Sequence, residues 1–100
     1  MTTDETIEAV LRWGNDKGLD DPKAQLNKVI EEVGEIAHEV TRNHYGHDFE
    51  DAIGDSLVTI IILSGICGID PRHCLKAAYN EIRWRKGHTE SGSFIKENDI

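Results

Sequence analysis

The chain has 100 residues, of which 19 are acidic and 11 basic, so its formal net charge is −8 at neutral pH. This length indicates one domain near the lower limit for burying a core alone, and the apolar content is that of a folded, soluble protein. The acidic balance argues against binding nucleic acid through its phosphate backbone, which requires a basic surface.

Apolar residues recur at helical spacing along most of the chain, without the alternation typical of strands. The first predicted helix covers about 4–17 and ends before Gly18, which suits a C-terminal cap. The second begins at Asp21-Pro22, since aspartate caps helices and proline fits their first turn, and the loop 43–48 ends it. Its predicted inward residues are Leu26, Val29, Ile30, Val33, Ile36, Ala37 and Val40.

The third predicted helix has Asp48 as its cap and runs to about residue 66. It is apolar on nearly every side from Leu57 to Leu63, and such a helix must be covered all round. Few helices from one small chain are available to cover it. We therefore expect partner subunits, in a homodimer or homotetramer.

The fourth predicted helix starts at Asp70-Pro71 and closes at Gly87, and the remainder reads as a polar tail with one apolar pair, Phe94 and Ile95. The predicted fold is all-α, with about four helices, an antiparallel pair carrying acidic faces, and a bundle completed by oligomerisation. We expect a single helical domain over 1–90 and a tail over 91–100.

Nothing in the sequence suggests export or membrane insertion. The first ten residues lack the basic and apolar regions of a signal peptide, and the most apolar run, "SLVTIIILSGICGI", is too short to span a bilayer. Cys67 and Cys74 form no CxxC motif. We expect a cytoplasmic protein with reduced thiols and no membrane contact.

Acidic residues cluster in the stretch "KVIEEVGEIAHEV". At about 100° per residue, Glu32, Glu35 and Glu39 share one face of the second helix, with Glu31 beside Glu35. Taken alone, this pattern is more often a solvated acidic surface than a site.

The third predicted helix favours a binding site over a solvated acidic surface, because Asp48, Asp51 and Asp55 share one of its faces beside its apolar stretch. A short loop joins the two helices, so we expect them to pack antiparallel with these aspartates opposite the glutamates. Converging carboxylates require a cation, and oxygen ligands favour Mg²⁺, for which Mn²⁺ can substitute.

The segments "EEVGE" and "DAIGDSLV" resemble the EExxE and ExxD signatures of MazG-like all-α nucleoside triphosphate pyrophosphohydrolases, of the short phage and bacterial type. The resemblance covers roughly 7–90 and includes the later "AYNEIRWRKG". It implies that Glu32, Glu35 and Asp55 bind metal. The glutamate of ExxD would fall at Ala52, so Asp51 is the expected substitute, and a weakened metal site is the alternative.

The remaining assignments each have a simpler explanation beside the functional one. Glu31 is either a group that orients water or a surface residue, and Glu39 is expected at the surface. Lys76, Asn80 and Arg83 share a face of the fourth helix, where they either bind phosphates or pair with acidic helices. Trp13 either stacks on a nucleobase or belongs to the core.

The predicted function is Mg²⁺-dependent hydrolysis of a nucleoside triphosphate, with a deoxynucleotide favoured, to the monophosphate and pyrophosphate. Glu31 or Glu35 would orient or deprotonate the attacking water. The alternative is a helical module of this type that has lost catalysis and acts by binding protein or nucleotide, as Ala52 suggests. A protein that mimics DNA would also be acidic, but its charge would spread over an outer surface, whereas the acidic residues here are expected to gather between two helices.

Overall fold

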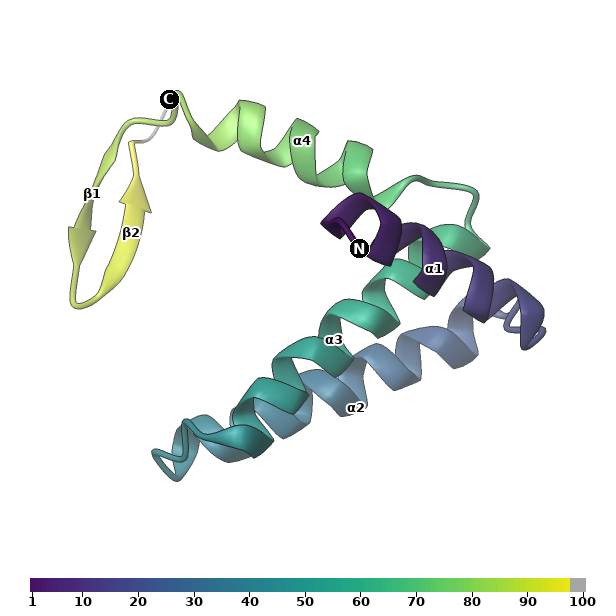
Figure 1. Cartoon of the computed structure of the whole chain (residues 1–100). Helices are drawn as coiled ribbons and strands as arrows, with labels where there is room; N and C mark the ends of the chain where they lie inside the picture. Colours follow the sequence, from purple (N-terminus) through teal and green to yellow (C-terminus); the bar gives the residue numbers. More distant parts are fainter. Residues whose placement is uncertain (98–100) are drawn as a thin grey trace.

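The computed structural model describes residues 1–97 as four helices followed by a β-hairpin (Figure 1). The helices are α1 (Thr3–Asp16), α2 (Pro22–Thr41), α3 (His47–Ile66) and α4 (Pro71–Ile82), and the strands are β1 (Gly87–Glu90) and β2 (Ser93–Lys96). The prediction of a mostly helical protein with four helices is confirmed, whereas the hairpin was not predicted.

The helix starts follow from capping residues in the sequence. The Asp21 and Asp70 carboxylates accept hydrogen bonds from the backbone N–H of Lys23, at 3.0 Å, and of Arg72, at 2.9 Å. These bonds satisfy N–H groups that have no partner within the helix. The expectation for Asp48 was wrong, because α3 already begins at His47 and its N-cap residue, Gly46, makes no side-chain hydrogen bond.

An antiparallel pair, α2 and α3, forms the centre of the molecule, and α1 crosses the C-terminal half of α3 (Figure 1). The crossing is close because Gly14 presents no side chain to Ile62, whose γ carbons would lie 3.2 Å from an added Cβ.

Among the described residues, no single helix is long and apolar enough to cross a bilayer. Helices α3 and α4 reach the required length and apolar character only when taken together, and the chain bends by 107° between them.

The chain buries little apolar surface by itself. Among the described residues only Ala52 and Ile62 are buried apolar side chains. The predicted inward stripe of α2 is largely wrong: Val29 and Ile36 are half-buried, but its other five residues, Leu26, Ile30, Val33, Ala37 and Val40, are exposed. The helix instead buries Gln25, whose side-chain amide donates to the Thr59 carbonyl at 3.1 Å.

The C-terminal part differs from the predicted helix and tail. Helix α4 ends at Ile82 rather than at Gly87, and Gly87 lies in β1, paired with Lys96. Ser91 and Gly92 both have positive φ, 48° and 79°, as a two-residue hairpin turn requires. The predicted domain boundary after residue 90 falls at this turn, and residues 98–100 of the predicted tail lie outside the described residues.

Candidate functional site

An acidic cleft of about 400 Å³ lies between the C-terminal half of α2 and the N-terminal half of α3. Six of its seven lining residues are carboxylates, and the seventh is a small apolar residue. The lining residues are Glu32, Glu35, Glu39, Asp48, Asp51, Ala52 and Asp55. With no basic side chain in its lining, the cleft has a strongly negative potential that favours a cation over a bare anion.

Helical spacing and antiparallel packing together build the cleft. The glutamates and the aspartates both follow the i, i+3, i+7 pattern, so each set occupies one face of its helix. Between them lies Ala52, only 4% exposed, which fills the contact between the two helices. The structure therefore brings Glu32, Glu35, Asp51 and Asp55 together, and their role as metal ligands stays a prediction.

Glu39 lines the cleft, although it was expected at the surface. Its side chain is 13% exposed, and its carboxylate lies 3.5 Å from the Nδ1 atom of His44 in the α2–α3 loop. A second histidine, His47, has its Nε2 atom 3.3 Å from the Asp51 carboxylate. The two histidines thus partner acids from both helices, and Glu39 had a sequence signal in its spacing from Glu32 and Glu35.

Glu31 lies outside the cleft, although it is the first glutamate of the EExxE motif. Its carboxylate is 3.3 Å from the Lys28 ammonium group, and both side chains are largely exposed. One residue along a helix is a turn of about 100°, so Glu31 and its neighbour Glu32 point in different directions. A role in orienting water stays a prediction for Glu31.

The donor types in the cleft suit a hard divalent cation. Carboxylate oxygens are the ligands that Mg²⁺ and Mn²⁺ prefer, and the cleft offers neither thiols nor imidazoles in its lining. In residues 1–97, no three His, Cys, Asp or Glu side chains are already grouped closely enough to hold a metal ion.

The predicted substrate-binding residues do not line the acidic cleft. Lys76, Asn80 and Arg83 lie at α4, with the Arg83 guanidinium 4.6 Å from the ring centre of Trp84. Trp13 lines a separate apolar hollow of about 330 Å³ between α1 and α3, and the Lys17 ammonium group is 5.8 Å from its ring centre. Their contact with a substrate stays a prediction.

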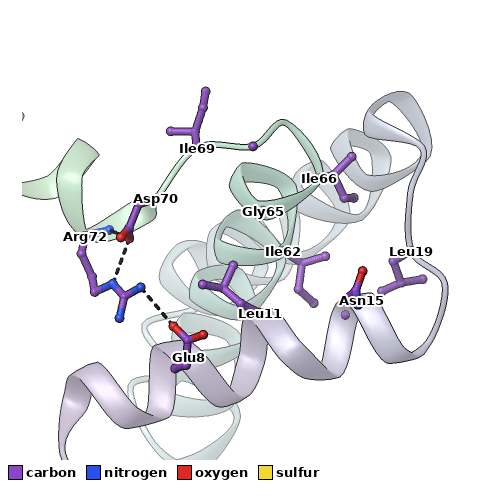
Figure 2. A pocket seen from close by; sticks show the side chains of 12 residues that line it. Glu8, Leu11, Asn15, Leu19, Ile62, Gly65, Ile66, Ile69, Asp70 and Arg72 are labelled. Atoms are coloured by element: carbon purple, nitrogen blue, oxygen red, sulfur yellow. Dashed lines mark hydrogen bonds and ion pairs between the residues drawn. The ribbon is translucent and has the colours of Figure 1, made fainter.

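A second cavity, of about 370 Å³, lies between α1, the end of α3 and the start of α4 (Figure 2). Arg72 crosses its edge and contacts Glu8 at 3.1 Å and Asp70 at 2.9 Å. Hydrogen bonds from the Arg72 side chain and backbone lower the pKa of Asp70, and the same pair raises the pKa of Arg72. Because two carboxylates already engage Arg72, this cavity lacks a free cation for phosphate.

No protein-family model, curated protein or solved structure matches the chain. The resemblance to MazG-like enzymes therefore rests on the sequence alone: on the two short motifs with their order and spacing, and on the later segment "AYNEIRWRKG". The geometry adds that both motifs contribute to one cleft.

Proposed function

We propose that the chain is a Mg²⁺-dependent hydrolase that converts nucleoside or deoxynucleoside triphosphates to the monophosphate and pyrophosphate. The observation that carries this proposal is the acidic cleft, where six carboxylates from two antiparallel helices face one another without a basic side chain. A polyphosphate can approach such a surface only with a cation between them.

In this proposal the metal ligands are Glu32, Glu35, Asp51 and Asp55, which all line the cleft. A bound Mg²⁺ would supply charge neutralisation at the phosphates and activation of water for attack on the α-phosphorus. Glu35, or Glu31 from the adjacent face, would accept the proton of that water. The hydrolysis then requires no protein nucleophile.

Substrate contacts by Lys76, Asn80, Arg83 and Trp13 complete the proposal. Helix α4 begins at the end of α3 that is remote from the acidic cleft (Figure 1). Phosphate contacts from Lys76, Asn80 and Arg83 therefore require α4 of a neighbouring copy or a movement of α4 in the same chain.

Ala52 supports a second candidate function. At this position the MazG-like motif would have a glutamate, and here a buried methyl group fills it. The second candidate is a helical module that has kept the cleft without catalysis and acts by binding protein or nucleotide. Such a module would release no pyrophosphate from any nucleotide.

Release of pyrophosphate from each common NTP and dNTP, measured with and without Mg²⁺, tests the proposal. We expect Mg²⁺-dependent release, and Glu35→Ala or Asp55→Ala should lower the rate by at least about a hundredfold, since each removes a ligand or the base. The control is Asp20→Ala, an exposed aspartate outside the cleft. Wild-type rates in both cleft variants would refute the proposed function.

A further inference from the structure

The cavity of about 370 Å³ where α4 joins α1 and α3 has the size of a small-molecule site (Figure 2). Such sites usually measure roughly 300–1,000 Å³. The apolar part of its lining comes from both helices and from the loop that follows each of them: Leu11, Leu19, Ile62, Ile66 and Ile69. Leu19 and Ile69 are still 37% and 49% exposed, so part of this apolar surface is accessible to a ligand.

Three charged side chains form the polar part of the lining, and their net charge is −1. Arg72 donates to one carboxylate oxygen of Glu8, at 3.1 Å, and to one of Asp70, at 2.9 Å. Within residues 1–97, the second oxygen of each carboxylate accepts no hydrogen bond. Two acceptor oxygens therefore remain for a ligand, whereas the one cation is already shared between two acids.

The ends of two helices add to the negative potential of the cavity. The last turns of α1 and α3 border it through Asn15 and Ile66. The C-terminal end of a helix carries a partial negative charge, and neither of these last turns contains a basic residue that would offset it. The positive end of α4 is already met by the Asp70 carboxylate, which accepts from the Arg72 backbone N–H. The cavity therefore favours a positively charged ligand.

The two parts of the lining together define the chemistry of that ligand. An ammonium group can donate charge-assisted hydrogen bonds to Glu8 and Asp70, and an aliphatic chain attached to it would cover the apolar side chains. A phosphate or carboxylate would meet the net negative charge and would have to displace an acid from Arg72. An inorganic cation would gain nothing from the apolar part of the lining.

We propose that this cavity binds an organic cation with a short aliphatic chain, that is, an aliphatic amine in its ammonium form. The ammonium group donates to Glu8 and Asp70, and the chain lies against Leu11, Ile66 and Ile69. Such a ligand contacts α1, α3 and the start of α4 together, and so stabilises the junction of the three helices. The cavity is separate from the acidic cleft, and the proposal does not depend on the proposed function.

Titration of the full chain with hexylammonium, followed by the chemical shifts of its backbone amides, tests the proposal. Excess Mg²⁺ is present to compete for the acidic cleft. We expect saturable shifts at the residues that line the cavity. The dissociation constant should be at least about tenfold lower than those of hexanoate, which has the same chain and the opposite charge, and of methylammonium, which has the same charge and no chain.

Two variants of the lining separate its charge from its space. Glu8→Gln keeps the size of the side chain and removes one charge, so it should raise the dissociation constant of hexylammonium about tenfold. The matched control is Glu50→Gln, an exposed glutamate of α3 that lines neither the cavity nor the cleft. Ile69→Lys adds an ammonium group of its own at a half-exposed position and should abolish binding.

Hydrogen exchange tests the effect of the ligand on the helix junction. Hexylammonium should slow the exchange of the α4 amides in the wild type and leave it unchanged in Ile69→Lys. Four results would each overturn the proposal: no saturable shift at the cavity, shifts confined to the acidic cleft, hexanoate binding as tightly as hexylammonium, or an unchanged dissociation constant in both Glu8→Gln and Ile69→Lys.

Discussion

At the scale of single residues, angular position decides what each acidic side chain can do. Glu31 and Glu32 are neighbours in the chain, yet Glu31 pairs with Lys28 in solvent while Glu32 lines the cleft. A residue step on a helix turns the side chain by about 100°, so adjacent glutamates have different surroundings. The role of each glutamate in such a motif therefore has to be assigned separately.

Asp51 is the residue on which the proposed metal site depends most, because Ala52 supplies no ligand. If Asp51 takes the place of the absent acid, Asp51→Asn removes one anionic ligand and should lower Mg²⁺-dependent pyrophosphate release at least about tenfold. The Mg²⁺ concentration for half-maximal rate should rise as well. Asp20→Asn is the matched control. An unchanged rate and Mg²⁺ requirement in Asp51→Asn would exclude this role.

At the scale of elements, one cluster of charged residues fixes the start of α4. Asp70 caps the helix and accepts a hydrogen bond from the Arg72 side chain, and Arg72 also contacts Glu8 of α1 (Figure 2). These bonds favour the ionised carboxylate, which is why the pKa of Asp70 lies below its ordinary 3.8. The cluster thus joins α4 to the rest of the molecule.

The lowered pKa of Asp70 predicts an acid-sensitive start of α4. A carboxyl group with a depressed pKa in the folded state stabilises the fold above its ordinary pKa, and that contribution is lost as pH falls through the lower, folded value. Hydrogen-exchange protection of the α4 amides should therefore fall below pH 3.8 in the wild type. Asp70→Ala should reduce this protection already at neutral pH, because the cap is absent.

Asp70→Asn separates the charge from the cap. Asparagine still accepts the backbone hydrogen bond but does not titrate, so the acid-dependent loss of α4 protection should become smaller in this variant. The same acid dependence in Asp70→Asn as in the wild type would show that other groups cause it.

The elements that the sequence predicted are those with local signals. Asp21-Pro22 and Asp70-Pro71 marked two helix starts, and Gly18, with φ of 72°, closes α1. The end of α4 was missed because Gly87 resembles a helix cap. Its actual role is in the hairpin, where a side chain at this position would collide with the Ile95 carbonyl and the Phe94 ring. The turn residues Ser91-Gly92 were the available signal.

At the scale of the whole molecule, the sequence predicted that one chain has too few helices to cover all of its apolar surface. It did not predict which helix faces stay uncovered. Periodicity gives the angle between residues of one helix, whereas the neighbour that covers each face depends on tertiary packing. For α2 the apolar stripe was expected to face inward, yet Gln25 lies against α3 while Ile30 and Val33 are uncovered. The convergence of the two acidic motifs was predictable, because a short loop forces the helices to be antiparallel.

The most direct test of the proposed role of the acidic cleft is calorimetric titration of the protein with a nucleotide that cannot be hydrolysed between its α- and β-phosphates. We expect binding that requires Mg²⁺ or Mn²⁺, with one nucleotide for each chain, and loss of that binding in Asp55→Ala while Asp20→Ala still binds. Absence of binding in the wild type with either cation, or equal binding without any cation, would contradict it.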